Sequence, residues 1–313
     1  MSLIVENLSI RTNQFQIIKD AFFKVEKGER VAVVGESGSG KSISALSILK
    51  LLPENLKVSG NIEVDGTNVN SLKGENLRKF RWNKVSIVFQ DPSASLNPLM
   101  KIKDQIGEAL LYHKKVEKKE VDKKVVELLR LVEIPEPEER INAYPHHLSG
   151  GLKQRVAIAM ALACNPDYIL ADEPTTALDV TVQSKILELL EKLSIKKNTG
   201  ILLITHDMGI VAEFSQKVFV MYAGYTVEAG KTEDIFKSPL HPYTKGLIEC
   251  SPILNGGKKR KLFYIPGNIP EPSEKIIGCP FHPRCPEAKE ICKRNIPPIL
   301  EINGRKVRCF LYF

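Results

Sequence analysis

Short runs of β-branched and aliphatic residues alternate with amphipathic segments over residues 1–237. The runs Val31–Val34, Val85–Phe89, Tyr168–Ala171 and Ile201–Ile204 have the length and composition of buried strands. Strands that alternate with helices are typical of a largely parallel sheet with crossover helices. We therefore expect an α/β fold over this part of the chain.

Helical spacing of apolar residues connects these predicted strands. Ser42–Leu52 is expected to form a helix directly after the first strand, and apolar residues recur at spacings of three and four over Val182–Leu193. Residues 92–147 interrupt the alternation: Ile102–Tyr112 and Val121–Val132 have helical patterns, and prolines separate them. We interpret this segment as a helical insertion.

The composition changes near Ser238. Residues 238–313 contain 13 Lys or Arg, 6 acidic residues, 11 of the 19 prolines and five of the six cysteines, which indicates a domain boundary. The tail therefore carries most of the net charge of +8, which argues against a basic nucleic-acid surface on the rest of the chain. With 43% hydrophobic residues and no apolar run long enough for a membrane span or a secretory signal, we expect a globular, cytoplasmic protein.

A phosphate-loop pattern follows the first predicted strand. Gly35-Glu-Ser-Gly-Ser-Gly-Lys-Ser42 lies between that strand and a predicted helix, as the pattern requires. In such a loop, backbone N–H groups point at the phosphates, Lys41 reaches the β- and γ-phosphates, and Ser42 offers its hydroxyl to Mg²⁺. The residues predicted to contact a nucleotide are Gly35, Glu36, Ser37, Gly38, Ser39, Gly40, Lys41 and Ser42.

Two carboxylates end the third predicted strand. Asp172 and Glu173 follow Tyr168–Ala171, at the sheet edge where ligands of α/β proteins bind. A carboxylate there can hold Mg²⁺, so Asp172 is the predicted metal ligand. Glu173 suits the activation of an attacking water, and the pair predicts nucleotide hydrolysis.

Further motifs follow in order along residues 35–207. Leu148-Ser-Gly-Gly151 resembles the signature of ATP-binding cassette (ABC) ATPases. Gln90 resembles the glutamine of the Q-loop, Ala177-Leu-Asp179 the D-loop, and His206 the switch histidine of this family. The resemblance implies a RecA-like nucleotide-binding domain with an inserted helical subdomain.

The resemblance also implies how the chain is divided. It places the RecA-like ATP-binding core at residues 1–91 and 155–237, and the helical subdomain with the signature at residues 92–154. The composition change near Ser238, not the resemblance, sets apart residues 238–313, which we expect to form a small, irregular C-terminal metal-binding domain.

Roles at the ATP site follow from the same resemblance. Glu173 would act as the base, Gln90 would contact Mg²⁺ and the water, and His206 would sense the γ-phosphate. The signature and the D-loop would complete the site of a partner subunit, through Ser149, Gly150, Gly151 and Asp179. The chain departs from the family in two places: Leu152 stands where glutamine is commonest, and Phe15 replaces the Tyr or Trp that usually stacks on adenine.

Four cysteines of the tail suggest a metal site. Cys279, Cys285, Cys292 and Cys309 lie in a Pro-rich segment with few helical or strand runs, so we expect a metal to organise it. Their spacing lacks the close pairs that zinc sites favour, and a four-iron iron–sulfur cluster is the preferred interpretation. Zinc and free structural thiols remain the alternatives.

Two tail segments narrow the family further. Ser238–Leu247 and Gly278–Pro286 resemble the C-terminal extension of ATPases that serve dipeptide, oligopeptide and nickel importers. The resemblance implies an ATP-hydrolysing subunit at the cytoplasmic face of the membrane. Its partners would be a second ATPase subunit, two transmembrane permeases and an extracytoplasmic binding protein, with no nucleic acid. The alternatives are a nickel importer ATPase and a soluble ABC ATPase that acts on nucleic acid or ribosomes.

Overall fold

The structure is a computed structural model that describes residues 1–176, 178–251 and 263–313. Ala177, in the predicted D-loop, and residues 252–262, in the predicted extension, lie outside the described residues. The chain divides into two compact units, of which the first comprises residues 1–26, 30–70 and 203–313 and the second residues 27–29 and 71–202. Strand β8 (Gly200–Thr205) runs from the second unit into the first.

A mixed sheet forms the first unit, with strand order β5-β4-β1-β2-β10-β9-β3. Its strands are β1 (Ser2–Arg11), β2 (Gln16–Glu26), β3 (Arg30–Val34), β4 (Lys57–Val64), β5 (Thr67–Asn68), β9 (Lys217–Tyr222) and β10 (Tyr225–Lys231). Strands β3 and β9 are parallel, whereas β1 pairs antiparallel with both β2 and β4, and β9 with β10. The prediction of a largely parallel sheet is therefore wrong for this unit, because short turns join β1 to β2 and β9 to β10.

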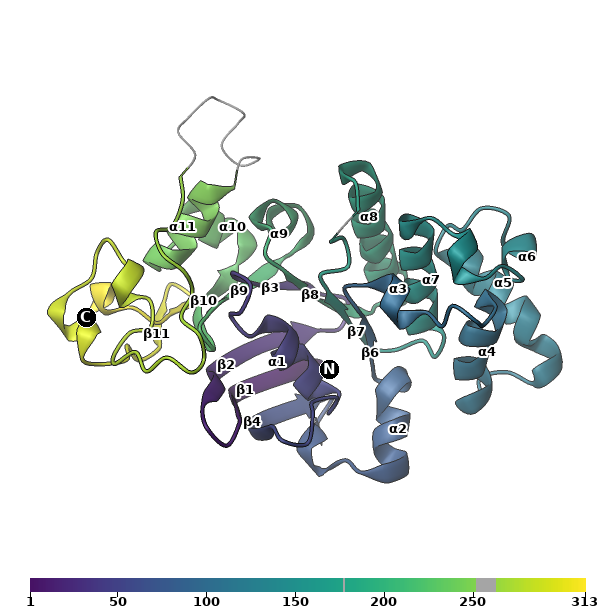
Figure 1. Ribbon diagram of the computed structural model, residues 1–313, viewed down its shortest axis with the longest axis horizontal. Coiled ribbons are helices and arrows are strands. Elements are labelled where there is room, and N and C mark those ends of the chain that lie inside the picture. The colour runs from purple at the N-terminus through teal and green to yellow at the C-terminus, as the bar shows by residue number, and fades with distance from the viewer. Residues whose placement is uncertain (177, 252–262) are drawn as a thin grey trace. The chain divides into compact units, whose positions relative to one another are not determined.

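The helices of the first unit are α1 (Lys41–Ile48), α9 (Met208–Phe214), α10 (Thr232–Lys237) and α11 (Pro242–Cys250). Helix α1 follows β3 as predicted but ends earlier, because Lys50 adopts a left-handed conformation with φ of 51°. Helices α9 and α10 contact each other, and they pack against β3, β9 and β10. Figure 1 shows α1 beside the strands of the N-terminal segment, in purple.

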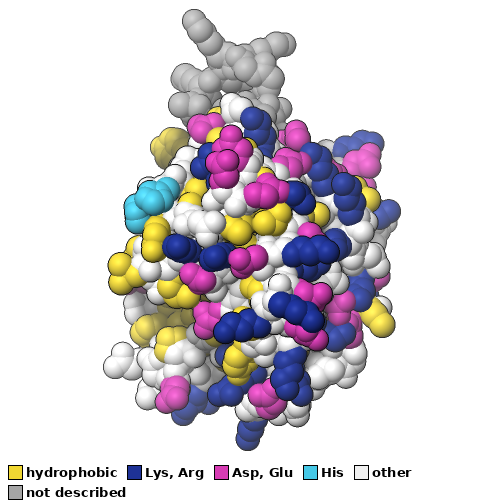
Figure 2. All heavy atoms as spheres, turned by 90° about the vertical axis from the view of Figure 1, so that its right-hand side faces the viewer, with side chains coloured by type: hydrophobic (Ala, Val, Ile, Leu, Met, Phe, Trp, Pro, Cys, Tyr) yellow, Lys and Arg dark blue, Asp and Glu magenta, His cyan; other side chains and the backbone are white. Residues whose placement is uncertain are grey.

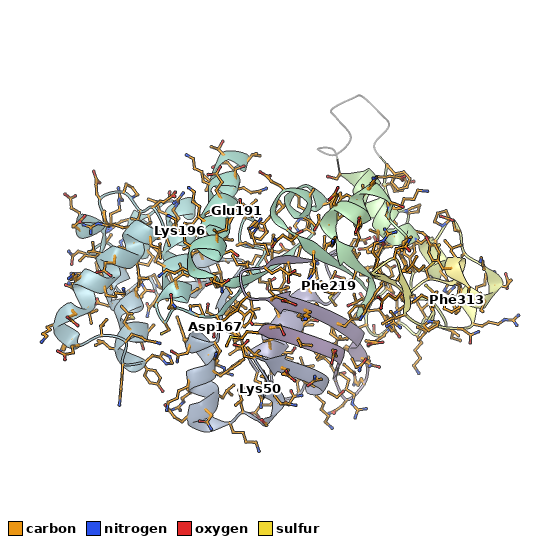
Figure 3. All side chains as sticks on the ribbon, turned by 180° about the vertical axis from the view of Figure 1, so that it is seen from behind. Lys50, Asp167, Glu191, Lys196, Phe219 and Phe313 are labelled. Carbon is orange, nitrogen blue, oxygen red and sulfur yellow. The ribbon has the colours of Figure 1, made fainter. Side chains whose placement is uncertain are left out.

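The core of the first unit is built from β-branched and aromatic residues of these strands. Strand β1 has a bulge between Val5 and Leu8, where Asn7 takes a φ of 49°, so that both flanking residues face the core. Phe219 of β9, labelled in Figure 3, makes edge contacts with Phe22 and Phe23 of β2 at ring distances of 6.1 and 6.4 Å. These contacts hold β9, which pairs with β3, the strand that leads into the phosphate loop.

The C-terminal extension has its own short elements. They are η4 (His282–Arg284), η5 (Glu290–Lys293), β11 (Leu300–Ile302), β12 (Arg305–Val307) and η6 (Phe310–Tyr312). Strand β12 pairs with β10, and Figure 1 shows the yellow end of the chain beside that strand. Buried Tyr243, Phe281 and Phe310 belong to one hydrophobic cluster with β9 and β10. The extension therefore buries apolar residues against β9 and β10, although its sequence has few helical or strand runs with which to build a core.

The second unit is mostly helical. Its helices are α2 (Gly74–Asn83), α3 (Pro92–Ser95), α4 (Ile102–Tyr112), α5 (Val121–Leu131), α6 (Pro137–Arg140), α7 (Gly150–Leu162) and α8 (Val180–Lys197), with turns η1 (Val69–Ser71), η2 (Lys118–Glu120) and η3 (Pro145–His147) at its borders and loops. Strands β6 (Val85–Val88) and β7 (Tyr168–Asp172) pair in parallel, as their sequence predicts. The predicted helices α4, α5 and α8 are confirmed within a few residues.

The helical side of the chain carries both signs of charge. Figure 2 shows Lys and Arg interspersed with Asp and Glu over the face that it presents. Lys124 pairs with Glu127 within α5, and Lys103 of α4 pairs with Asp122 of α5. In the described part of the chain, no helix combines the length and the apolar character that crossing a membrane demands.

Candidate functional site

The phosphate loop lies between β3 and α1 in the first unit. Gly35 has no room for a side chain, because an added Cβ would lie 2.2 Å from the carbonyl oxygen of Met221. Gly40 precedes α1 with a φ of 103°, a conformation that other residues rarely adopt. The loop therefore brings its backbone close to the start of α1, where the N–H groups of a helix attract phosphate.

Lys41 is almost fully buried at the first position of α1. Its ammonium group donates hydrogen bonds to the carbonyl oxygens of Gly35 and Glu36, at 2.7 and 2.9 Å. These contacts hold the ammonium group inside the curve of the loop. Ser42 follows in the first turn of α1 and is half-buried.

The two predicted carboxylates end β7 in the second unit. Asp172 is the last residue of the strand and is buried, and Glu173 follows with a φ of 45°. The hydroxyl of Thr176 donates to Oε2 of Glu173 at 2.9 Å, and the side-chain amide of Gln90 donates to the same oxygen at 3.2 Å. The structure therefore brings together Gln90 and Glu173, as the predicted roles require, and it adds Thr176. Thr176 belongs to none of the motifs recognised in the sequence, and only the folded structure shows its contact with Glu173.

The signature forms the start of α7. Ser149 is the N-cap residue, and its hydroxyl accepts from the N–H of Leu152 at 3.5 Å. Gly150 and Gly151 form the first turn, and an added Cβ on Gly151 would lie 2.7 Å from Val182 of α8. Glycine is therefore needed at residue 151 for α7 to pack against α8. This requirement is separate from the contact with a nucleotide that the motif predicts.

The remaining predicted residues lie at loop positions. Asp179 is the N-cap residue of α8, and its carboxylate accepts from the N–H of Val182 at 3.0 Å. His206 follows β8 and is exposed, just before Asp207, which caps α9. Phe15 lies half-buried at the turn between β1 and β2, where its N–H donates to the hydroxyl of Thr12 at 3.0 Å.

The four predicted cysteine ligands line one small cavity of the extension. Cys279, Cys285, Cys292 and Cys309 share it with His241 and Phe281. Burial raises the pKa of the Cys279 and Cys285 thiols to about 11, so these thiols stay protonated at neutral pH unless a cation binds them. Among the described residues, no three or more His, Cys, Asp or Glu side chains form a group that could hold a metal ion.

Comparison with protein families finds two matches. A family model described as "ABC transporter" matches residues 18–176, and one described as "Oligopeptide/dipeptide transporter, C-terminal region" matches residues 227–292. The two matches cover the phosphate loop with both carboxylates, and the start of the extension with three of its four clustered cysteines.

Curated relatives match over almost the full chain. The chain is 46% identical to the oligopeptide transport ATP-binding protein AppD of Bacillus subtilis, over 100% of this chain and 98% of that protein. It is 45% identical to OppD of Salmonella typhimurium, over 94% and 87%, and 44% identical to the dipeptide transport ATP-binding protein DppD of Bacillus subtilis, over 99% and 94%.

Solved structures match the cassette portion. A dimer of the ATP-binding cassette MJ0796 in a post-hydrolysis state, bound to ADP and Pi, matches with a TM-score of 0.65 and 31% identity, over 74% of this chain and 99% of that one. The cbiO1 protein of Clostridium perfringens, part of the ABC transporter complex cbiONQ, matches with a TM-score of 0.66 and 29% identity, over 75% and 90%.

Proposed function

The chain belongs to the ABC transporter family, and we propose that it is the ATP-hydrolysing subunit that powers import of dipeptides or oligopeptides through separate membrane subunits. The observation that carries this function is the 46% identity to an oligopeptide transport ATP-binding protein along the whole chain. The match of residues 227–292 to the C-terminal region of such transporters supports peptides as the cargo.

We propose the following roles at the ATP site. Lys41 neutralises the β- and γ-phosphates, and Ser42 and Asp172 hold Mg²⁺, which would offset the charge that develops on the transferred phosphoryl group. Glu173 accepts a proton from the attacking water. Its hydrogen bonds from Thr176 and Gln90 support this role, because they hold the carboxylate in one orientation from which it can reach the water.

We propose that the other motif residues act across a dimer of ATPase subunits. Ser149, Gly150 and Gly151 at the start of α7 would face the γ-phosphate bound by the partner, since a helix N-terminus attracts anions. Asp179 would contact the partner, and His206 would sense the γ-phosphate. Phe15 would stack on adenine. The dimer of ATPase subunits would lie at the cytoplasmic face of the membrane. Its partners there would be two transmembrane permeases, and an extracytoplasmic binding protein would deliver the peptide.

Transport in vesicles tests this function. The chain, purified with its membrane partners, is reconstituted in vesicles and supplied with ATP and with radiolabelled dipeptides, oligopeptides or nickel. We expect ATP-dependent uptake of a peptide, and no uptake when Lys41→Ala replaces the wild type. Uptake of nickel alone would instead identify a nickel importer, and ATPase activity stimulated by nucleic acid would contradict the transport function.

We propose that the four cysteines of the extension bind an iron–sulfur cluster. The support is that Cys279, Cys285, Cys292 and Cys309 line one cavity, although 30 positions separate the first from the last. Four thiolates are the ligand set of a four-iron cluster.

Metal analysis of anaerobically purified protein tests the cluster. We expect a brown protein that absorbs broadly near about 400 nm and contains iron and acid-labile sulfide in near-equal amounts. A Cys292→Ser variant should lose the colour, whereas Cys164→Ser, a cysteine buried in the second unit, should keep it. A colourless protein with one zinc per chain would support the zinc alternative, and a metal-free protein would contradict both.

A further inference from the structure

Glu36 of the phosphate loop is held by partners inside and outside the loop. Its carbonyl oxygen accepts from the ammonium group of Lys41 at 2.9 Å and from the N–H of Ser39 at 3.2 Å. Its backbone N–H donates to the hydroxyl of Tyr243 at 2.8 Å, and its Oε2 pairs with the guanidinium of Arg284 at 2.9 Å. Tyr243 and Arg284 lie outside the phosphate loop, in the C-terminal extension.

Both of these partners are themselves fixed. Tyr243 is fully buried in the first turn of α11. The Arg284 side chain is only 7% exposed, and its Nε donates to the carbonyl oxygen of Pro266 at 2.8 Å. The Arg284 guanidinium also lies 5.8 Å from the ring centre of Tyr222, the last residue of β9. Neither side chain can therefore follow a movement of Glu36 freely.

Aromatic contacts join these partners to the cysteine-bearing segment. The rings of Tyr222, Tyr243 and Phe281 lie 4.6 to 5.3 Å apart in all three pairings. Phe281 lies two residues after Cys279, and both belong to the same hydrophobic cluster. The segments around Tyr243 and Arg284 thus form one packed body beside the phosphate loop.

We propose that Tyr243 and Arg284 are positioning residues for ATP binding, which hold Glu36 and, through its carbonyl oxygen, the ammonium group of Lys41 in the geometry that receives the phosphates. The inference rests on the role proposed above for Lys41. It gives the extension a function in the ATP site of its own chain.

The physical reason is that Arg284 is the one hydrogen-bond partner of the Glu36 side chain among the residues that the structure describes. Its second carboxylate oxygen, Oε1, is buried and has no hydrogen-bond partner among the described residues. Without Arg284 the half-buried carboxylate would turn toward water and carry the loop backbone with it. Removing only the hydroxyl of Tyr243 would leave its ring in place. The N–H of Glu36 would then have lost its hydrogen-bond acceptor, while the ring still excludes other groups from that position.

Binding of a fluorescent ATP analogue, methylanthraniloyl-ATP with Mg²⁺, measures the effect on the full chain. Tyr243→Phe should weaken binding about threefold to tenfold, and Arg284→Gln about tenfold or more, because bonds to charged groups are the stronger ones. Arg284→Lys should restore part of the affinity. Tyr312→Phe is the matched control, since the Tyr312 hydroxyl donates to Leu240 within the extension and should leave binding unchanged.

A double-mutant cycle separates positioning from mere folding of the extension. In a Glu36→Gln background, Arg284→Gln should cause little further loss of affinity, because its effect passes through the Glu36 carboxylate. A loss of the same size in both backgrounds would overturn the inference, as would wild-type affinity in Arg284→Gln or Tyr243→Phe. If Lys41→Ala also bound the analogue normally, the role of Lys41 itself would be wrong, so the two failures are distinguishable.

Discussion

The side-chain amide of Gln90 lies 3.2 Å from the carboxylate of Glu173, although 83 residues separate them in sequence. Gln90 follows β6 and Glu173 follows β7, and these two strands pair in parallel within the second unit. Parallel pairing places the ends of both strands at one edge of the sheet, so the loops that follow them meet there. Glu173 has a φ of 45°, which is a strained backbone conformation for a residue other than glycine. In this conformation its carboxylate lies beside Gln90, where the two loops meet.

We expect Glu173→Gln to slow ATP turnover by at least about a hundredfold while ATP affinity stays near normal. A general base contributes roughly 10² to 10⁴ in rate, whereas the binding contacts come from other groups. Single-turnover hydrolysis and equilibrium binding measure the two quantities separately. Lys41→Ala, the comparison variant, should weaken binding itself, and equal loss of affinity in both variants would contradict the assigned roles.

Ser149 offers a way to separate helix capping from phosphate contact. Ser149→Asp keeps an N-cap acceptor for α7, so we expect its thermal unfolding midpoint to stay within a few degrees of wild type. The added negative charge should nevertheless suppress hydrolysis in the assembled transporter, because it would face the partner's γ-phosphate. Ser149→Ala should show the reverse balance, with lower stability and milder loss of activity. Wild-type hydrolysis by Ser149→Asp would argue against a phosphate role for this residue.

Asp167, labelled in Figure 3, contributes stability that depends on pH. Burial opposes its ionised form, but hydrogen bonds from Lys27 and Lys84 outweigh burial and lower the pKa of the carboxyl group. The folded state therefore binds a proton less readily than the unfolded state. The contribution is fully present above the ordinary pKa of about 3.9 and is lost as the pH falls from there through the lowered native value.

Asp167→Asn should accordingly reduce the free energy of unfolding by about 1 kcal/mol at pH 7, a modest value because water screens both partly exposed lysines. The difference between variant and wild type should shrink as the pH falls below about 4. Urea unfolding at a series of pH values measures it. A difference that grows toward acidic pH would contradict the direction of the shift.

Much of the cassette could be predicted because its strands and helices are locally regular. Val85–Val88 and Tyr168–Asp172 form β6 and β7 as expected, and Ile102–Tyr112 forms α4 with the predicted bounds. The two strand segments are mostly apolar runs of strand length, and the helix segment repeats its apolar residues at spacings of three and four. The motif residues around them are recognisable for the same reason, because phosphate binding requires glycines and a lysine at fixed spacing.

The N-terminal strands were not predicted, because a bulge interrupts their pattern. Between Val5 and Leu8 the register shifts, and the alternation of buried and exposed residues in β1 breaks there. A strand is recognised in sequence by an unbroken alternation of apolar and polar residues, which β1 therefore lacks. The ties between the extension and the phosphate loop are equally hidden in sequence. Tyr243 and Glu36 lie 207 residues apart, and no periodicity connects two segments at that distance.

Glu228 of β10 anchors the start of the extension, although it is fully buried. Its two carboxylate oxygens accept from the backbone N–H groups of Leu240 and His241, each at 2.9 Å. Burial raises the pKa of Glu228 in spite of these bonds, so the folded state holds a proton at a pH where the unfolded state has lost it. The stability from this group is therefore fully present at low pH and falls as the pH rises through the raised value.

Glu228→Ala leaves two N–H groups without their acceptor and should destabilise this junction by about 2–4 kcal/mol. Hydrogen–deuterium exchange should then accelerate at Leu240 and His241. Glu228→Gln keeps one carbonyl oxygen as an acceptor, cannot ionise, and should exchange at an intermediate rate that no longer depends on ionisation of residue 228. The amides of β6, in the other unit, serve as the internal control and should exchange as in wild type. Unchanged exchange at Leu240 and His241 in Glu228→Ala would show that the carboxylate is dispensable for the anchor.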